Sequence, residues 1–167
     1  MYQIGQLVVY GIHGVCRITQ LENRKVSGKV MRYLVLEPLL HESSQYLVPA
    51  ENPVVLSKLR PVLTQEHMQQ LLTSSNIFED AWIPDEGQRK HHYRDLIGSG
   101  DVSSMLRMLH SVYLHRREQL ASGKKVHQCD DNFLRDAERQ LCEEICIVMQ
   151  LPMEQAKAQL RSQLRYE

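Results

Sequence analysis

The sequence predicts an α+β protein, in which a small antiparallel β-barrel is followed by an all-α helical bundle. Up to about residue 62, short runs of β-branched and aromatic residues alternate with tight-turn residues. From residue 64 onward, apolar residues recur with the spacing of amphipathic helices. This change of period predicts three parts: a barrel over 1–62, a short helix and linker over 63–76, and a helical unit over 77–167.

Five short strands are expected in the first part. They span 6–10, 14–21, 30–36 and 46–48, with 54–56 as a possible fifth. Gly28 stands where the tight turn between the second and third strands needs a positive φ, and Pro49 ends the fourth strand. Strands this short, joined by tight connections, favour a strongly bent barrel that closes most of its edges.

Each expected helix of the second part begins at a capping residue or a proline. The starts are Thr64, Pro84, Asp101, Asp130 or Asp131, and Pro152. The first four helices end near residues 73, 97, 121 and 148, and Gly100 and Gly123 act as stop signals. Their apolar stripes predict the interior of a bundle, with a partner-binding groove as the alternative.

The charges balance over the whole chain but not along it. Twenty Lys and Arg face twenty Asp and Glu, which excludes a protein that finds nucleic acid by overall charge. Within 87–125, however, eight Lys and Arg face three Asp and Glu, and four histidines are added. Such a patch suits a phosphate backbone, although a solvated helix surface is the alternative.

Several classes of protein are disfavoured by the composition. No apolar run is long enough to span a membrane and no signal peptide is recognisable, so the cytoplasm is the expected compartment. We expect no enzyme, no cofactor and no small-molecule substrate, because no catalytic set and no phosphate-binding loop is present.

Four residues raise the question of a metal site. His127, Cys129, Cys142 and Cys146 could approach one another, but cysteines on a helix beside apolar residues behave as small core residues. We therefore expect no metal.

Four segments carry a resemblance to a known family. The run IGQLVVYGIHGV at 4–15, RYLVL at 32–36, VPAEN at 48–52 and SGDV at 99–102 resemble the CarD/CdnL transcription regulators of bacteria. The amino-terminal part also resembles the RNA-polymerase-interacting domain of transcription-repair coupling factors. The resemblance implies a Tudor-like (SH3-like) barrel that docks on the β subunit of RNA polymerase. It also implies a helical domain that contacts promoter DNA at the upstream edge of the transcription bubble and modulates open-complex stability.

The resemblance assigns the DNA contact to Trp82 and to the basic residues Arg89, Lys90 and Arg94. In the family a tryptophan wedges into the distorted minor groove while cations hold the flanking phosphates. Here residues 83–88 separate Trp82 from the first arginine, whereas the family pattern places arginines directly after the tryptophan. Trp82 is thus either a wedge or a core residue.

The same resemblance, together with charge, assigns polymerase binding to four positions of the barrel. These are Arg24, Lys25, Arg32 and Leu47, the last standing where some relatives carry an arginine. Docking would raise the local concentration near DNA to the order of mM, so weak intrinsic DNA affinity would suffice. The alternative function is a polymerase-binding adaptor without direct DNA contact.

Overall fold

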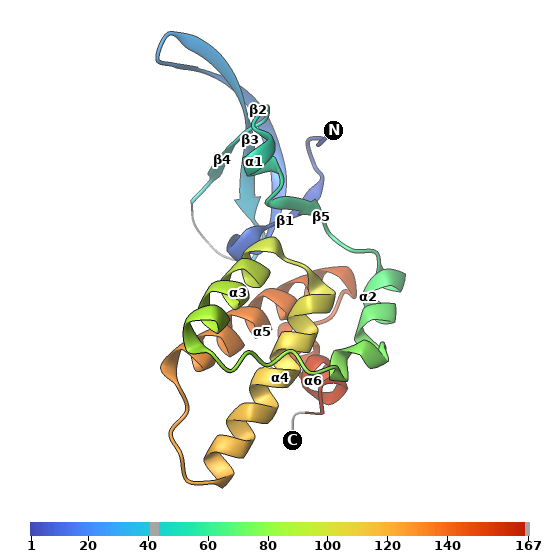
Figure 1. Ribbon diagram of the computed structural model, residues 1–167. Helices are drawn as coiled ribbons and strands as arrows, with labels where there is room; N and C mark the ends of the chain where they lie inside the picture. Colours follow the sequence, from blue (N-terminus) through green and yellow to red (C-terminus); the bar gives the residue numbers. More distant parts are fainter. Residues whose placement is uncertain (41–43, 166–167) are drawn as a thin grey trace. The chain divides into compact units, whose positions relative to one another are not determined.

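One antiparallel sheet of five strands forms the first unit of the chain, Met1–Val62 (Figure 1). The structure is a computed structural model that describes residues 1–40 and 44–165. The strands lie in the order β4-β3-β2-β1-β5. Their bounds are β1 Leu7–Tyr10, β2 Val15–Val26, β3 Lys29–Pro38, β4 Tyr46–Pro49 and β5 Leu59–Pro61.

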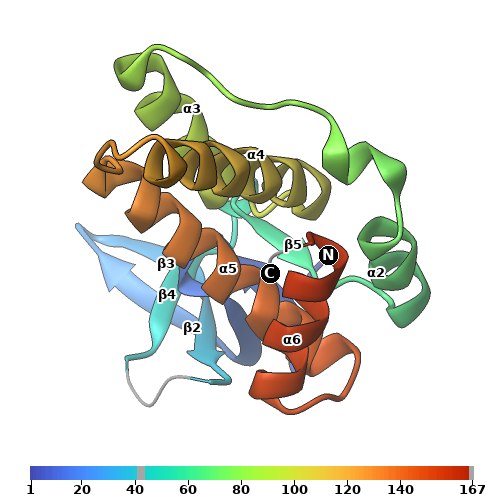
Figure 2. The ribbon, with the colours of Figure 1, turned by 90° about the horizontal axis from the view of Figure 1, so that it is seen from below.

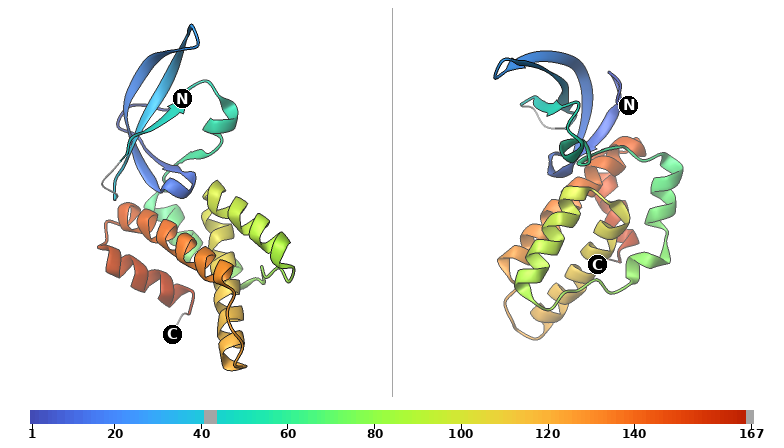
Figure 3. Two further views of the ribbon diagram at one scale, coloured as in Figure 1. Left: turned by 90° about the vertical axis from the view of Figure 1, so that its left-hand side faces the viewer. Right: turned by 45° about the horizontal axis from the view of Figure 1, so that its top comes forward.

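The β2–β3 hairpin is the longest feature of this sheet and extends beyond the other strands (Figures 1 and 3). Its turn consists of Ser27 and Gly28, with φ of 50° and 82°, which confirms the expected tight turn. The register shifts between Ile18 and Gln20, and such a bulge bends the strand. Beyond this bulge, β1 does not accompany β2, and β4 pairs only with the inner part of β3.

The fifth strand lies later in the chain than the sequence pattern predicts. Val54 and its neighbours form a short helix, α1 Pro53–Leu56, and a 3₁₀ turn, η1 Gly11–His13, follows β1. The Asn52 side chain accepts hydrogen bonds from the backbone N–H groups of Val54 and Val55, and a proline occupies the first helical position. Capping therefore prevails over the β-branched residues, and the strand prediction for 54–56 was wrong.

The first unit has its own core. Seven buried side chains from the sheet form it: Val8, Cys16, Ile18, Leu34, Leu36, Val48 and Leu59.

The second unit, Leu63–Glu167, is a bundle of helices (Figure 2). Its elements are α2 Gln65–Leu72, η2 Ser75–Phe78, α3 Glu86–Ser99, α4 Val102–Ala121, α5 Gln128–Val148 and α6 Met153–Gln163. Buried residues of α3, α4, α5 and α6 share one apolar core with Met68 and Leu72 of α2 and Ile77 of η2. The α+β fold class predicted from the sequence is thereby confirmed. Residues 63–76, predicted as a separate short helix and linker, lie within this unit.

Several helix starts are where the sequence predicts them. The side chains of Thr64 and Asp101 cap α2 and α4 by accepting first-turn N–H groups, and Gly100 ends α3 in the left-handed conformation. Two starts differ. α3 begins at Glu86 with Asp85 as its cap, after Pro84 rather than with it, and α5 begins at Gln128, before Asp130.

Candidate functional site

An extended segment, residues 79–85, lies along α4 and connects η2 to α3 (Figures 1 and 2). We call it the strap. Three side chains of α4 hold it, and they stand four residues apart and so share one face of the helix. Arg107 pairs with Glu79 at 3.2 Å, and the Ser111 hydroxyl accepts the Ala81 N–H at 2.8 Å. The third, His115, contacts the ring of Trp82.

Trp82 is half-buried against the core of the second unit. Its indole stacks on His115, with ring centroids 3.6 Å apart and planes 16° apart, and the Arg89 guanidinium lies 4.3 Å from its ring centroid. Its backbone N–H donates to Asp80 at 2.9 Å. Trp82 is thus neither a fully buried core residue nor a free surface residue. Its ring contacts other side chains of the same unit, while part of the side chain remains at the surface.

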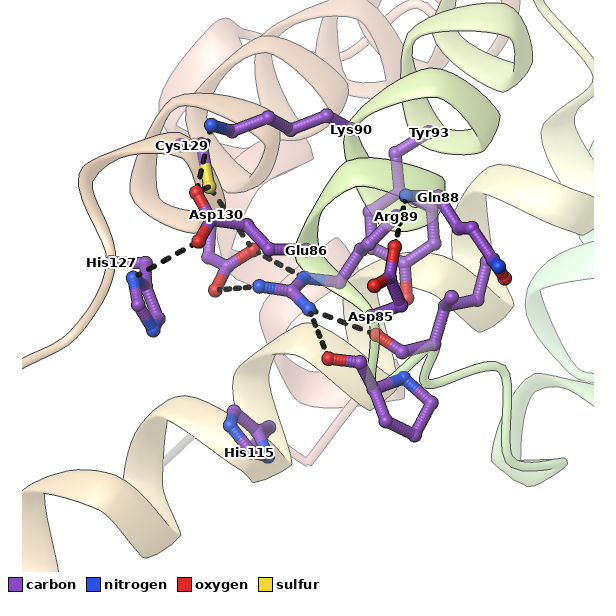
Figure 4. Close-up of polar contacts among 12 residues, drawn as sticks. Asp85, Glu86, Gln88, Arg89, Lys90, Tyr93, His115, His127, Cys129 and Asp130 are labelled. Carbon is purple, nitrogen blue, oxygen red and sulfur yellow. Dashed lines mark hydrogen bonds and ion pairs between the residues drawn. The ribbon is translucent and has the colours of Figure 1, made fainter.

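Arg89 lies inside the bundle and is only 2% exposed. Its Nε and Nη2 donate to the two carboxylate oxygens of Asp130 at 2.8 and 3.2 Å (Figure 4). Its Nη1 donates to the strap carbonyls of Ile83 and Pro84 at 2.9 and 3.2 Å. Burial by itself would lower the pKa of Arg89. The hydrogen bond and the negative charge of Asp130 act in the opposite direction, so the net shift of the pKa is upward and the guanidinium stays charged. This corrects the expectation for Arg89, whose donors are directed inward and not towards a phosphate at the surface.

Tyr93 supports the strap from α3. Its hydroxyl donates to the Ala81 carbonyl at 2.8 Å. Burial raises the pKa of Tyr93 to about 12, so the hydroxyl remains protonated and a donor at neutral pH. Its ring packs edge-on against Phe133 of α5.

The other two predicted DNA contacts lie at the surface of α3. Lys90 is partly exposed and pairs with Glu86 at 2.7 Å, and this hydrogen bond and charge lower the pKa of Glu86. Arg94 is exposed and forms no ion pair with another residue in the part of the chain that the structure describes. The structure therefore separates the three predicted cations into one buried residue, one paired surface residue and one open surface residue.

The cationic excess within 87–125 is largely compensated by acids that lie outside that window. Four of its cations pair with such acids: Arg89 with Asp130, Lys90 with Glu86, Arg107 with Glu79, and Arg116 with Asp131. The exposed cations outside these pairs are Arg94, Arg117, Lys124 and Lys125. A count along the sequence could not find this compensation, because two of the acids come from α5.

The four predicted polymerase contacts divide between the two faces of the first unit's sheet. Residues directly opposite in the register share a face, and faces alternate along a strand. Arg24 lies opposite Met31, while Arg32 lies opposite Asn23 and Lys25 opposite Val30. We call the face with Arg24 and Met31 the outer face, and the face with Lys25 and Arg32 the inner face.

The outer face extends onto the edge strand β4. Leu47 lies opposite Val35, two steps along β3 from Tyr33 and four from Met31, and so belongs to it. Met31 and Leu47 are large exposed apolar residues, at 38% and 36%, and Arg24 pairs with Glu22 at 2.8 Å. The outer face therefore exposes two large apolar side chains together with an ion pair.

The inner face leads towards the core of the first unit. Arg32 stands beside a groove whose walls come from the amino-terminal residues, from β2 and β3, from residues 50–51 and from α1. The apolar lining includes Met1, Tyr2, Leu21, Leu34, Ala50 and Leu56. Lys25 and Arg32 are thus separated by the sheet from Arg24 and Leu47.

Comparison with known families identifies this first unit. The model of the CarD-like/TRCF RID domain matches residues 2–62, which are the first unit almost end to end. The first unit is a CarD-like RNA-polymerase-interacting domain. The match confirms the resemblance over the first unit, and a domain of this kind indicates interaction with RNA polymerase. The family consists of polymerase-interacting regulatory domains and is not an enzyme family.

The remaining candidate residues are distributed over the second unit. Cys142 is fully buried, and burial raises the pKa of its thiol to about 12. Cys129 lies near Glu86 and Asp130, and Cys146 is half-buried. No three His, Cys, Asp or Glu side chains within 1–40 and 44–165 are arranged to hold a metal ion. Over the same residues, no helix is both long and apolar enough to cross a membrane.

Sequence reasoning missed the partners that fix the strap. Asp130 was assigned to a helix cap, and Ser111 and His115 were not singled out as candidates. A signal existed for part of this set, because Arg107, Ser111 and His115 place polar side chains four residues apart along a helix that also supplies many residues to the core. A polar line of this kind on a core helix indicates that another segment lies along it.

Proposed function

We propose that this chain is a bacterial transcription regulator that docks on the β subunit of RNA polymerase and contacts promoter DNA at the upstream edge of the transcription bubble. In this role it modulates the stability of the open complex. The match of residues 2–62 to a polymerase-interacting domain supports docking. The observation that carries the DNA contact is the half-exposed Trp82, held on a strap that leads into a helix with the partly exposed Lys90 and the exposed Arg94 on its surface.

The outer face of the first unit is the proposed docking surface. Met31 and Leu47 supply exposed apolar area, and Arg24 supplies charge that can select an acidic partner surface. β4 is an edge strand of the sheet, and its outer edge can pair with a strand of the polymerase. Lys25 and Arg32, on the inner face, would add long-range attraction and not direct contact.

The proposed DNA contact uses the accessible part of Trp82, together with Lys90 and Arg94. A flat apolar side chain placed at a distorted base step stabilises partly unstacked DNA, while cations hold the phosphates beside it. Arg89 takes no part in this contact, because its donors are occupied inside the bundle. With few open cations, intrinsic DNA affinity is low, and tethering to the polymerase supplies the local concentration.

The test is the lifetime of the open complex formed by polymerase on a ribosomal-type promoter. Trp82→Ala should change this lifetime from that given by the unaltered protein, with binding to polymerase retained. Phe78→Ala is the control, since Phe78 is an aromatic residue at the surface of the same unit. A Trp82→Ala protein that binds polymerase and leaves the lifetime unchanged would overturn the DNA contact.

A second candidate function is a polymerase-binding adaptor that makes no DNA contact. The acids around Trp82 favour it, since Glu79, Asp80, Asp85 and Glu86 would repel phosphates. An adaptor would be captured by polymerase but would leave the upstream-edge footprint on promoter DNA unchanged. An extended or altered footprint at that edge would exclude it.

A further inference from the structure

We infer that Arg89, Asp130 and His115 are positioning residues, which fix the strap on the bundle and thereby set the orientation of Trp82. The inference deepens the proposed function, and its consequence for DNA binding rests on that function. The positioning of Trp82 itself is argued only from contacts within the second unit.

Arg89 connects three elements at one buried point. It belongs to α3, its Nη1 holds two strap carbonyls, and its Nε and Nη2 hold Asp130 of α5 (Figure 4). A planar guanidinium can satisfy these acceptors together, whereas a lysine ammonium is a point charge on a flexible stem. Without Arg89, the two carbonyls next to Trp82 would lose their donor, and the Asp130 carboxylate would be left unpaired in the interior.

His115 holds the indole from the other element that borders the strap. Its ring stacks on Trp82, and Gln119, one turn further along α4, contacts its Nε2 at 3.1 Å. His115 is itself half-buried, so its ring has little freedom to rotate away from Trp82. The indole is therefore contacted by a ring from α4 and by a guanidinium from α3, and both are anchored by further partners.

This arrangement has a consequence for DNA recognition. A side chain ordered before binding loses less conformational entropy when it engages its target, and a wedge must enter a base step in one orientation. Arg89 then influences the DNA contact through Trp82 without touching DNA. Substituting it should imitate loss of the tryptophan, although the tryptophan remains present.

Trp82 is the only tryptophan of the chain, so its fluorescence reports the strap directly. In the full chain, Arg89→Lys and Asp130→Asn should raise the acrylamide quenching constant about twofold or more, because the strap opens locally. His115→Ala should raise it less, and His115→Phe, which retains a stacking ring, should restore the original value. Arg94→Gln is the matched control, since Arg94 is an exposed arginine of the same helix, and should leave quenching unchanged.

Circular dichroism of each variant confirms that the bundle is retained. Unchanged quenching in folded Arg89→Lys and Asp130→Asn proteins would overturn the positioning role. If these two variants lose helical signal, His115→Ala carries the test, because its half-buried side chain lies outside the buried ion pair. Unchanged quenching in that variant would then overturn the inference.

The open-complex lifetime separates this inference from the proposed function. Arg89→Lys should shift the lifetime in the same direction as Trp82→Ala, and the double variant should go no further. If quenching rises but neither variant affects the lifetime, the positioning role stands and the proposed DNA contact fails. If Trp82→Ala changes the lifetime and Arg89→Lys does not, despite raised quenching, the consequence inferred for DNA is wrong.

Discussion

The ion pair between Arg89 and Asp130 places two charges where neither is solvated. Their side chains are 2% and 4% exposed. A buried pair of this kind adds little to stability relative to apolar residues of the same volume, but removing one partner leaves the other charge in a low-dielectric interior. The main contribution of each residue is therefore to compensate the buried charge of the other.

Asp130→Ala should lower the free energy of unfolding by about 3–5 kcal/mol, because the Arg89 guanidinium would be left buried without its carboxylate. Urea denaturation followed by circular dichroism measures this change. Glu86→Ala is the control, since it removes the acid of the partly exposed pair with Lys90 at the start of α3. We expect it to change the free energy of unfolding little. An Asp130→Ala protein as stable as the original would contradict the burial of the pair.

The long β2–β3 hairpin carries three of the four predicted polymerase contacts, so the face of the sheet on which each one lies decides which of them can share an interface. Neighbouring residues such as Arg24 and Lys25 point to opposite faces, so proximity in sequence does not place them at the same interface. The three cations Arg24, Lys25 and Arg32 look like one cluster in the sequence but lie on two different faces of the sheet. Only one of them lies on the face with Leu47.

Arg24→Glu should weaken binding to polymerase strongly, while Arg32→Glu should weaken it much less. The two changes are matched, since both reverse an exposed arginine on the same hairpin, and they differ in the face they alter. A charge reversed at a contact meets direct repulsion, whereas a remote one mainly slows association in a salt-dependent way. Pull-down and association kinetics with polymerase measure both. Equal losses, or a greater loss for Arg32→Glu, would move the docking surface to the inner face.

The elements themselves were predictable where the signal was local. Thr64 and Asp101 cap their helices through bonds to residues three positions away, and Gly28 serves a two-residue turn. The prediction failed for 54–56 because a cap at Asn52 outweighed strand propensity. It failed for Asp130 because that side chain bonds an arginine 41 positions away instead of its own helix end.

The candidate site shows the same division at the scale of the whole chain. Trp82 was found as a candidate because it is the only tryptophan, and the polymerase-interacting unit because several motifs stand in order. The burial of Arg89 and the neutralised basic patch depend on partners from other helices, which no local pattern contains. A net charge of zero thus reflects paired charges as well as balanced totals.

A chain with a net charge of zero has little means of finding DNA alone, since affinity for the phosphate backbone depends on the number of cations that meet it. In the proposed function, docking by the first unit raises the local concentration of the second unit at the promoter to the order of mM. The two units should therefore act in sequence and not independently. Substitutions in them should then be non-additive, as expected for coupled steps.

Trp82→Ala should accordingly have no effect on open-complex lifetime in a protein that already carries Arg24→Glu. Loss of docking removes the local concentration on which the DNA contact depends, so the tryptophan has no further contribution to lose. Lifetimes measured for the original protein, the two single variants and the double variant complete the cycle, with Phe78→Ala in the same background as the control. If Trp82→Ala changes the lifetime equally with and without Arg24→Glu, the second unit reaches DNA without docking. Tethering to the polymerase would then not explain how a chain with a net charge of zero contacts DNA.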